Sequence, residues 1–413
     1  MELKKYLYRH KWTLILLLPL LAVLSNALLH PTKRGKLFGS IRLKGEVINT
    51  SYGKAYIKTD RGLIFKLYPP KGKKLFVSDT VEVWGKAHGF RLYAEKLKIH
   101  RSSLQRLRVK IHTLLKERFL KTAKSKFEKK LGSALLFGEN WFSRKEKLKM
   151  SHLGIYHIIV ISGLHYALIF TFFLIFPVRW KLRYWLALAF FTFFTFLILF
   201  PKAPAYRAFM SFLLFLSAKI LERRYSSLKA LILAATLWIA LFPHWVFNIG
   251  FWLSYLASLS LILYYGGGRT PEENFFRNFF GKFLGLEATL VVSVAISPLL
   301  VYTFHYLSFG GFLFAWIFTP LAVAFILVSL LNGLTLWSFT PLLEVQHLTA
   351  NLFEGVFRTL PETVYINTPT IPKWEVYPLT ILALVAVALP IPKKWLLLIF
   401  LLLLETAIFL IHP

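Results

Sequence analysis

A succession of long apolar runs leaves this chain of 413 residues little choice of fold. Most of the runs are long enough to cross the hydrocarbon core of a bilayer, which takes about 20 residues of helix. Backbone N–H and C=O groups inside a bilayer need partners within the protein, so runs of this kind form helices. The runs are 12–29, 153–176, 184–200, 205–221, 228–242, 245–265, 284–304, 307–337, 377–390 and 395–411. Because 56% of all residues are hydrophobic, the sequence predicts a polytopic α-helical membrane protein.

One sizeable polar region follows the first run. Alternating stretches such as Ile41–Val47 and Val81–Gly85 are separated by turn signals such as Asp60-Arg61-Gly62. About five short strands suit a small closed barrel of the OB type. We therefore expect an OB-like all-β barrel over residues 33–101. It would follow a basic leader and a first transmembrane helix over residues 1–30, the latter a retained anchor and not a cleaved signal peptide.

The segment 102–130 changes to helical spacing, with apolar residues such as Leu104, Leu107 and Ile111 recurring between Lys and Arg. This pattern predicts a basic amphipathic helix that lies on a membrane surface. From Lys33 to Lys130 there are 27 Lys and Arg residues against 7 Asp and Glu residues. Such a basic block suits either anionic lipid headgroups or a polyanion such as DNA, and the two interpretations are compatible.

On the barrel, basic residues are candidates for guiding the phosphates of DNA. OB-fold barrels also bind single strands by stacking bases on aromatic side chains, although barrel aromatics can equally fill the core. The available aromatic residues are Tyr52, Tyr56, Tyr68, Trp84, Phe90 and Tyr93. The DNA-guiding candidates are Arg42, Lys44, Lys58, Lys66, Lys86 and Arg91.

The charge distribution predicts the orientation in the membrane. The basic leader keeps the N-terminus in the cytoplasm, which places the barrel on the extracytoplasmic side. A single helix over 307–337 would put Lys393 and Lys394 outside, against the positive-inside rule. We therefore expect this run to be broken near Thr319-Pro320, as two short passes or a re-entrant loop.

Polar residues interrupt the second run at His157, Ser162, Gly163 and His165. On a continuous helix the two histidines would lie about 80° apart and share one broad face. Three roles are open for this segment: interhelical hydrogen bonds, the lining of a wet passage, or chemistry. Two histidines are too few for a metal site, and no third group is apparent that would orient a catalytic base.

The segment from His157 to His165 closely resembles the H-x-x-x-I-S-G-L-H signature of the ComEC competence-protein family. Three further runs are similar to that family and occur in the same order, so that the resemblance covers most of the chain from 131 to about 330. They are the R-A-x-M run at Arg207–Met210, the G-F-x-L-S-x-x-A run at Gly250–Ala257, and Ser297-Pro298 followed by Pro320.

The resemblance implies that residues 131–413 form a multi-span competence domain, a channel that moves single-stranded DNA across the inner membrane in natural transformation. The expected partners are single-stranded DNA, membrane lipids, an extracytoplasmic DNA receptor, and a cytoplasmic motor or single-strand binding protein. An oligomer is compatible with this role. The candidate channel-lining or gating residues are His157, Ser162, Gly163, His165, Arg207, Ser254 and Pro320.

The chain departs from the family pattern in two places. Trp316 stands where a polar Asn is expected, and no H-x-H-x-D-H metal run occurs, so we expect a form without the metallo-β-lactamase-like domain. No Walker A motif, cysteine or metal-ligand cluster is apparent, so we expect neither a cofactor nor an enzyme. Two alternatives remain: a membrane enzyme acting on a lipid or glycan through His157, Ser162 and His165, and an exporter of an anionic polymer.

Overall fold

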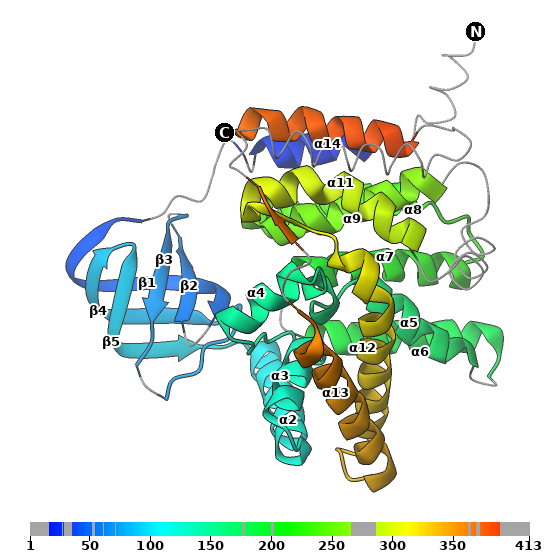
Figure 1. Cartoon of the computed structure of the whole chain (residues 1–413). Coiled ribbons are helices and arrows are strands. Elements are labelled where there is room, and N and C mark those ends of the chain that lie inside the picture. Colours follow the sequence, from blue (N-terminus) through cyan, green and yellow to red (C-terminus); the bar gives the residue numbers. More distant parts are fainter. Residues whose placement is uncertain are drawn as a thin grey trace.

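The computed structural model describes residues 16–26, 28, 35–51, 54–60, 62–70, 72–175, 178–199, 202–265, 286–361, 365–368 and 372–388. It consists of a β-barrel near the N-terminus and a larger helical part beside it (Figure 1). The predicted run 395–411, most of the leader and Tyr52 lie outside the described residues.

The barrel is the predicted one, with five strands. These are β1 (Leu37–Ser51), β2 (Lys54–Thr59), β3 (Ile64–Tyr68), β4 (Thr80–Gly89) and β5 (Arg91–His100). Their order is β1-β2-β3-β5-β4, and β1 closes the barrel by pairing with β4. Apolar side chains such as Val47, Phe65 and Val83 point inward at every second position, which explains the alternation in the sequence. Strands β3 and β5 pair in parallel, and the other strand pairs of the barrel are antiparallel.

Apart from its first helix, the helical part follows the barrel in the chain. Its α-helices are Leu16–Asn26, α2 (Ser103–Thr122), α3 (Lys126–Leu135), α4 (Arg144–His152), α5 (Gly163–Ile175), α6 (Trp180–Phe193), α7 (Ala203–Ile220), α8 (Ser227–Leu241), α9 (Ile249–Tyr265), α11 (Leu286–Phe304), α12 (Gly310–Leu334), α13 (Thr340–Thr359) and α14 (Lys373–Ala388). Shorter elements are the 3₁₀ helices η1 (Tyr156–Ile159) and η3 (Pro243–Phe247), the π-helix η2 (Phe194–Ile198), and the strands β6 (Tyr306–Ser308) and β7 (Tyr365–Asn367).

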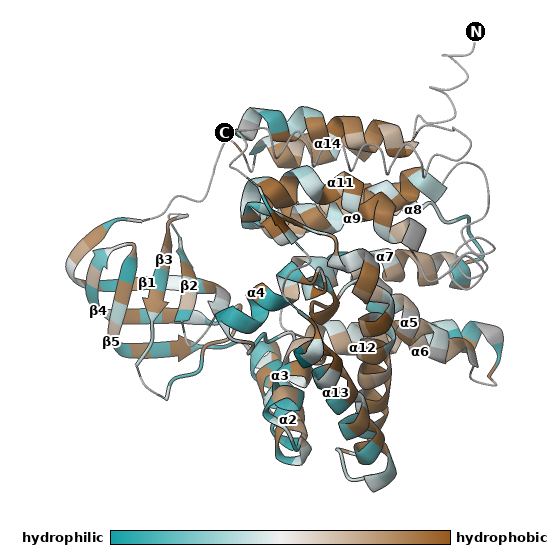
Figure 2. Ribbon diagram, in the orientation of Figure 1, coloured by the Kyte–Doolittle hydropathy of each residue, from teal (hydrophilic) through white to brown (hydrophobic). Residues whose placement is uncertain are grey.

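In Figure 1, helices α7, α8, α9, α11 and α14 run across the view in a stack, whereas α2, α3, α12 and α13 run down it. The stack is mainly apolar, while the barrel, α2 and α4 carry many hydrophilic residues (Figure 2). By length and composition alone, Lys181–Ile198 and Leu313–Leu334 are long and apolar enough to cross a membrane, and several shorter helices are similarly apolar.

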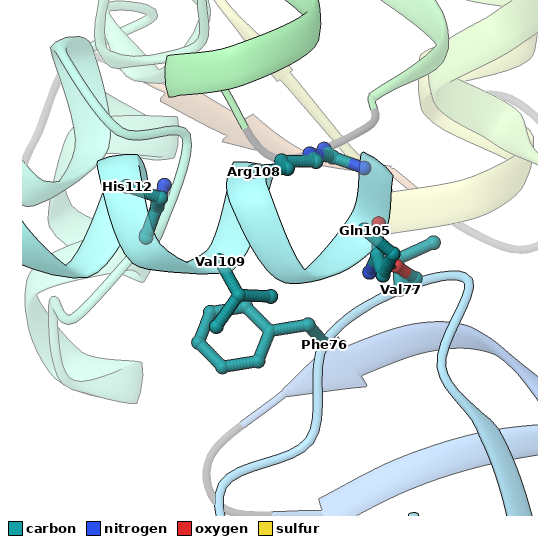
Figure 3. Close-up of a pocket in the computed structure, with 6 residues that line it drawn as sticks. All are labelled: Phe76, Val77, Gln105, Arg108, Val109 and His112. Carbon is teal, nitrogen blue, oxygen red and sulfur yellow. Dashed lines mark hydrogen bonds between the residues drawn. The ribbon is translucent and has the colours of Figure 1, made fainter. Parts of the chain in front are cut away.

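The barrel is anchored to helix α2 through a buried carboxylate. Asp79 is fully buried and accepts two hydrogen bonds from the Arg101 guanidinium, at 2.7 and 2.8 Å. The side chain of Gln105 donates to the Val77 carbonyl at 2.8 Å. Figure 3 shows the loop of Phe76 and Val77 against this end of α2, where they enclose a small cavity of about 10 Å³.

The sequence predicted one helix over residues 102–130, but the structure has two. Helix α2 ends at Thr122 and α3 begins at Lys126, with the Ser125 side chain accepting from the Glu128 amide at 2.9 Å. The local cause is a capping serine, whose side chain satisfies an amide that has no partner in the first turn. Leu104 and Leu107 on α2 are exposed, and the contact of this helix with a membrane surface stays a prediction.

The buried face of α2 binds the end of η2. Arg108 donates to the Leu199 carbonyl at 2.8 Å, and the His112 ring contacts the Ile198 carbonyl at 2.6 Å. His112 and Lys116 also bond to Glu139. Burial alone would raise the pKa of Glu139, but the hydrogen bond with His112 and the charge of Lys116 lower that pKa to about 2.

The predicted break at Thr319-Pro320 is wrong. Helix α12 continues through Pro320, and α13 packs along it. The chain still returns to its starting point, because β6 before α12 pairs with β7 after α13. Packing against α13 supports α12 next to this proline: the ring centroids of Phe318 on α12 and Phe353 on α13 lie 4.8 Å apart.

The hairpin of α12 and α13 begins at a close backbone crossing. A Cβ atom on Gly310 would lie 2.4 Å from the Leu153 carbonyl oxygen, and one on Gly154 would lie 2.3 Å from the Gly311 nitrogen. The Ser308 hydroxyl also donates to the His152 carbonyl at 2.6 Å. The glycines therefore hold the start of α12 against the end of α4.

Candidate functional site at the start of helix α5

The signature segment is not the continuous helix that the sequence predicted. Helix α4 ends at His152, and Gly154 has a φ of +66°. His157 lies in η1, the backbone at Val160 is extended, and only His165 lies on α5. The shared helix face of the two histidines is therefore wrong, although the two rings remain close enough to interact electrostatically. His157 is exposed, whereas His165 is 3% exposed.

Ser162 and His165 contact each other at the first turn of α5. The Nδ1 atom of His165 accepts from the Ser162 amide at 3.1 Å and lies 3.0 Å from the Ser162 hydroxyl. Accepting an amide proton requires that Nδ1 be unprotonated, so the neutral ring carries its proton on Nε2. Nε2 is buried and has no hydrogen-bond partner among the described residues. This contact caps the helix and fixes the orientation of the ring.

Arg207 joins α5, α7 and α9. Its Nε donates to the Ser254 hydroxyl at 2.7 Å, and the side chain is only 9% exposed. A Cβ atom on Gly163 would lie 3.1 Å from the Arg207 Nη2. The structure thus brings together three candidates, Gly163, Arg207 and Ser254, that are up to 91 positions apart in the sequence.

Pro320, by contrast, is exposed on α12 and takes no part in these contacts. Sequence reasoning overlooked Tyr255, whose buried hydroxyl has no partner within the described residues and lies near enough to Arg207 to interact electrostatically. Its signal was its position directly after Ser254, inside the same motif.

The chemistry of the site is limited by what surrounds it. The Ser162–His165 contact resembles a nucleophile paired with its general base, but such a base also needs a third group to orient it. Over the described parts of the chain, no group of three or more His, Asp or Glu residues is placed to hold a metal ion. The arrangement can donate hydrogen bonds and present a positive charge.

A model of the Competence protein family matches residues 135–411, well over half of the chain. The chain belongs to the Competence protein family. This family takes part in DNA uptake for transformation, and its members are membrane proteins. The family that the motifs indicated is thereby confirmed.

An uncharacterized protein of Aquifex aeolicus (strain VF5) is 29% identical to this Competence protein over 259 residues. The aligned part covers 60% of this chain and 58% of that protein, so the chain spans little more than half of its length. No solved structure matches the chain.

On the barrel of this Competence protein, the DNA-guiding candidates all lie outside the barrel core. Lys44, Lys86 and Arg91 are exposed, Arg42 lies over the Trp84 ring at 5.2 Å, and Lys58 and Lys66 are partly buried.

The candidate aromatics that the structure describes (Tyr56, Tyr68, Trp84, Phe90 and Tyr93) are also outside the core cluster, whereas Phe65 fills the core. Tyr68 and Tyr93 stack at 4.8 Å between ring centroids, and Tyr93 is 40% exposed. Lys66 lies over the Tyr68 ring at 5.8 Å. A basic and aromatic outer surface of this kind can contact both phosphates and bases.

The barrel and the helical site are on neighbouring surfaces. Burial, and then the charge of Lys58 on β2, lower the pKa of His244 in η3 to about 4. Lys58 of the barrel therefore lies within electrostatic range of η3, which directly precedes α9.

Proposed function

We propose that this protein is an inner-membrane channel that moves single-stranded DNA into the cytoplasm during natural transformation. Its family supplies the process, DNA uptake. The observation that carries the proposal is the meeting of Gly163, Arg207 and Ser254 from three separate apolar helices, two of which belong to the stack. Polar groups at membrane depth persist where they meet protein partners or line a wet passage.

In this proposal the OB-like barrel lies on the extracytoplasmic side and receives the strand. Its outer surface offers Arg42 beside Trp84 and the stacked pair Tyr68 and Tyr93. Lys and Arg side chains neutralise phosphates without regard to sequence, which suits a protein that accepts any DNA. The barrel then passes the strand to the neighbouring end of the helices, where His157 is exposed and Arg207 lies.

The channel would work with other components. A cytoplasmic motor or single-strand binding protein would pull or trap the entering strand, and an extracytoplasmic receptor would deliver it. Anionic lipids would contact the exposed basic and apolar surface of α2. More than one copy of the chain can contribute to the passage.

The first test is a deletion strain supplied with fluorescent DNA. We expect DNA to bind to such cells and accumulate outside the cytoplasm, and re-expression of the intact gene to restore cytoplasmic entry. Normal cytoplasmic entry in the deletion strain would contradict the proposal. Adsorption of DNA at the cell surface serves as the control, because it precedes the membrane step.

The second test concerns the orientation. Because the chain contains no cysteine, single cysteines can be placed at Lys58 and Trp180 and treated with a membrane-impermeant thiol reagent. We expect the reagent to label position 58 in intact cells and position 180 only after lysis. The reverse pattern would place the barrel in the cytoplasm.

A further inference from the structure

Arg207 is a buried cation that has no buried anion beside it among the residues that the structure describes. Its side chain is 91% removed from solvent, and within the described residues its hydrogen bond is to the neutral hydroxyl of Ser254. No carboxylate of the described residues forms an ion pair with it. Buried charges in proteins are normally paired, because an isolated one keeps the full cost of leaving water.

The start of helix α5, next to the Arg207 guanidinium, adds to the uncompensated positive charge. The Arg207 Nη2 lies 3.1 Å from the position of a Cβ atom on Gly163, the first residue of α5. The first amides of a helix have no intrahelical acceptor, and the helix dipole places a partial positive charge there. A guanidinium and a helix N-terminus thus face each other, although both are positive and both are donors.

A third donor lies nearby. The hydroxyl of Tyr255, a residue only 8% exposed, has no hydrogen-bond partner among the described residues. It follows Ser254 on α9 and interacts electrostatically with Arg207. Three elements thus bring hydrogen-bond donors near one another, and the Tyr255 hydroxyl among them has no partner within the described residues.

We propose that Gly163, Arg207 and Tyr255 form a binding site for one phosphodiester group of the strand that passes through the protein. This inference rests on the proposed function and identifies a single contact within it. An anion between Arg207 and the start of α5 would remove the repulsion between them, and its oxygens would accept from guanidinium, amides and hydroxyl. The site contacts the phosphodiester group and not the bases, so it binds a strand of any sequence.

The absence of a side chain at Gly163 is part of this site. An alanine methyl group would lie against the Arg207 Nη2 and occupy the space in which the guanidinium meets the helix N-terminus. No positive φ is required at Gly163, so the backbone itself accepts alanine there. Gly163→Ala therefore perturbs the anion site while keeping every charge.

The test measures DNA binding by the purified full-length protein in nanodiscs of neutral lipid. The probe is a fluorescent single-stranded oligonucleotide, and its dissociation constant is measured over a series of salt concentrations. The log–log slope reports about 0.7 per phosphate contacted on a single strand. We expect Arg207→Gln to reduce that slope by about 0.7 and Arg207→Lys to retain most of it.

Arg224→Gln is the matched control, because Arg224 is exposed on the segment between α7 and α8. We expect this variant to leave the slope unchanged. An oligonucleotide of the same sequence with a neutral methylphosphonate backbone should bind weakly and equally to the wild type and to Arg207→Gln. Gly163→Ala should weaken binding of the ordinary oligonucleotide without lowering the unfolding temperature.

An unchanged salt slope in a folded Arg207→Gln variant would overturn the phosphodiester site. If Arg207→Gln unfolds, Gly163→Ala gives the decision, because it keeps every charge and crowds the Arg207 guanidinium: unchanged oligonucleotide binding by a folded Gly163→Ala variant would overturn the site. The proposal would also be refuted if Arg207→Gln left the salt slope of DNA binding unchanged and lowered the stability of the protein only in nanodiscs that contain anionic lipid. That result would assign the site to lipid headgroups.

The two proposals fail in different ways. Normal DNA entry in the deletion strain would remove the channel function whatever the slopes are. Loss of entry in that strain, together with equal slopes for the wild type and Arg207→Gln, would remove only this site.

Discussion

The close crossing of α12 over the end of α4 makes Gly310→Ala a sharp test of the structure. The added methyl group would lie 2.4 Å from the Leu153 carbonyl oxygen, whereas ordinary contact begins at 3.4 Å. The obstacle is backbone, which moves only if α12 shifts as a whole. Gly355→Ala on α13 is the same chemical change with no atom within 4 Å of the new methyl group.

The two substitutions should have opposite signs. Overpacking a closely fitted contact costs about 1–3 kcal/mol, so Gly310→Ala should destabilise by that amount. An alanine in place of a glycine in a helix interior is favourable by about 1 kcal/mol, so Gly355→Ala should stabilise. The two variants should therefore differ by about 2–4 kcal/mol in their free energy of unfolding, by subtraction of these two estimates.

Thermal unfolding of the purified protein in detergent, followed by circular dichroism, measures this difference. At roughly 2–4 °C per kcal/mol, the midpoint for Gly310→Ala should fall by several degrees while that for Gly355→Ala rises slightly. Equal midpoints for the two variants, or a more stable Gly310→Ala, would refute the crossing of α12 and α4 described above.

Three further predictions concern single contacts. Arg101→Ala leaves the fully buried Asp79 without its ion pair and should destabilise the protein by about 3–5 kcal/mol in thermal unfolding, whereas exposed Arg106→Ala should change little. The folded-state pKa of Glu139 is about 2, against 4.5 for an unperturbed glutamate, so the stability that this carboxylate contributes is complete above about pH 4.5 and is lost as the pH falls toward 2. Acid unfolding of Glu139→Gln should lack that loss. His165→Asn keeps a hydrogen-bond acceptor and should retain much of the DNA uptake, whereas His165→Leu should lose it at equal protein abundance. Equal and complete loss in both would favour a chemical role for the imidazole.

Local patterns in the sequence are sufficient to predict much of the fold. The period-two alternation around Val47 and Val83 indicates the barrel, because a half-buried strand points every second side chain inward. The end of α4 also has a local signal: Gly154 follows the last turn and takes a positive φ, as glycines after helices commonly do. Reading that glycine would have corrected the predicted helix through His157 and His165.

Other features depend on distant parts of the chain. Pro320 favours a break in any helix taken alone, yet α12 is continuous because α13 packs along it and β6 pairs with β7. Likewise, alternation places Trp84 and Tyr93 on one face of each strand, but only barrel closure decides that this face is the outside.

The same division applies to the candidate site. The sequence by itself determines that polar residues stand within apolar runs and that their motifs are those of the Competence protein family. It carries no information on which of them meet, because contacts between helices depend on the rotation and crossing of each helix, not on spacing along the chain. Only the tertiary structure brings Arg207 to Ser254 and Gly163 and leaves Pro320 apart, since the packing of α5, α7 and α9 fixes where each side chain ends.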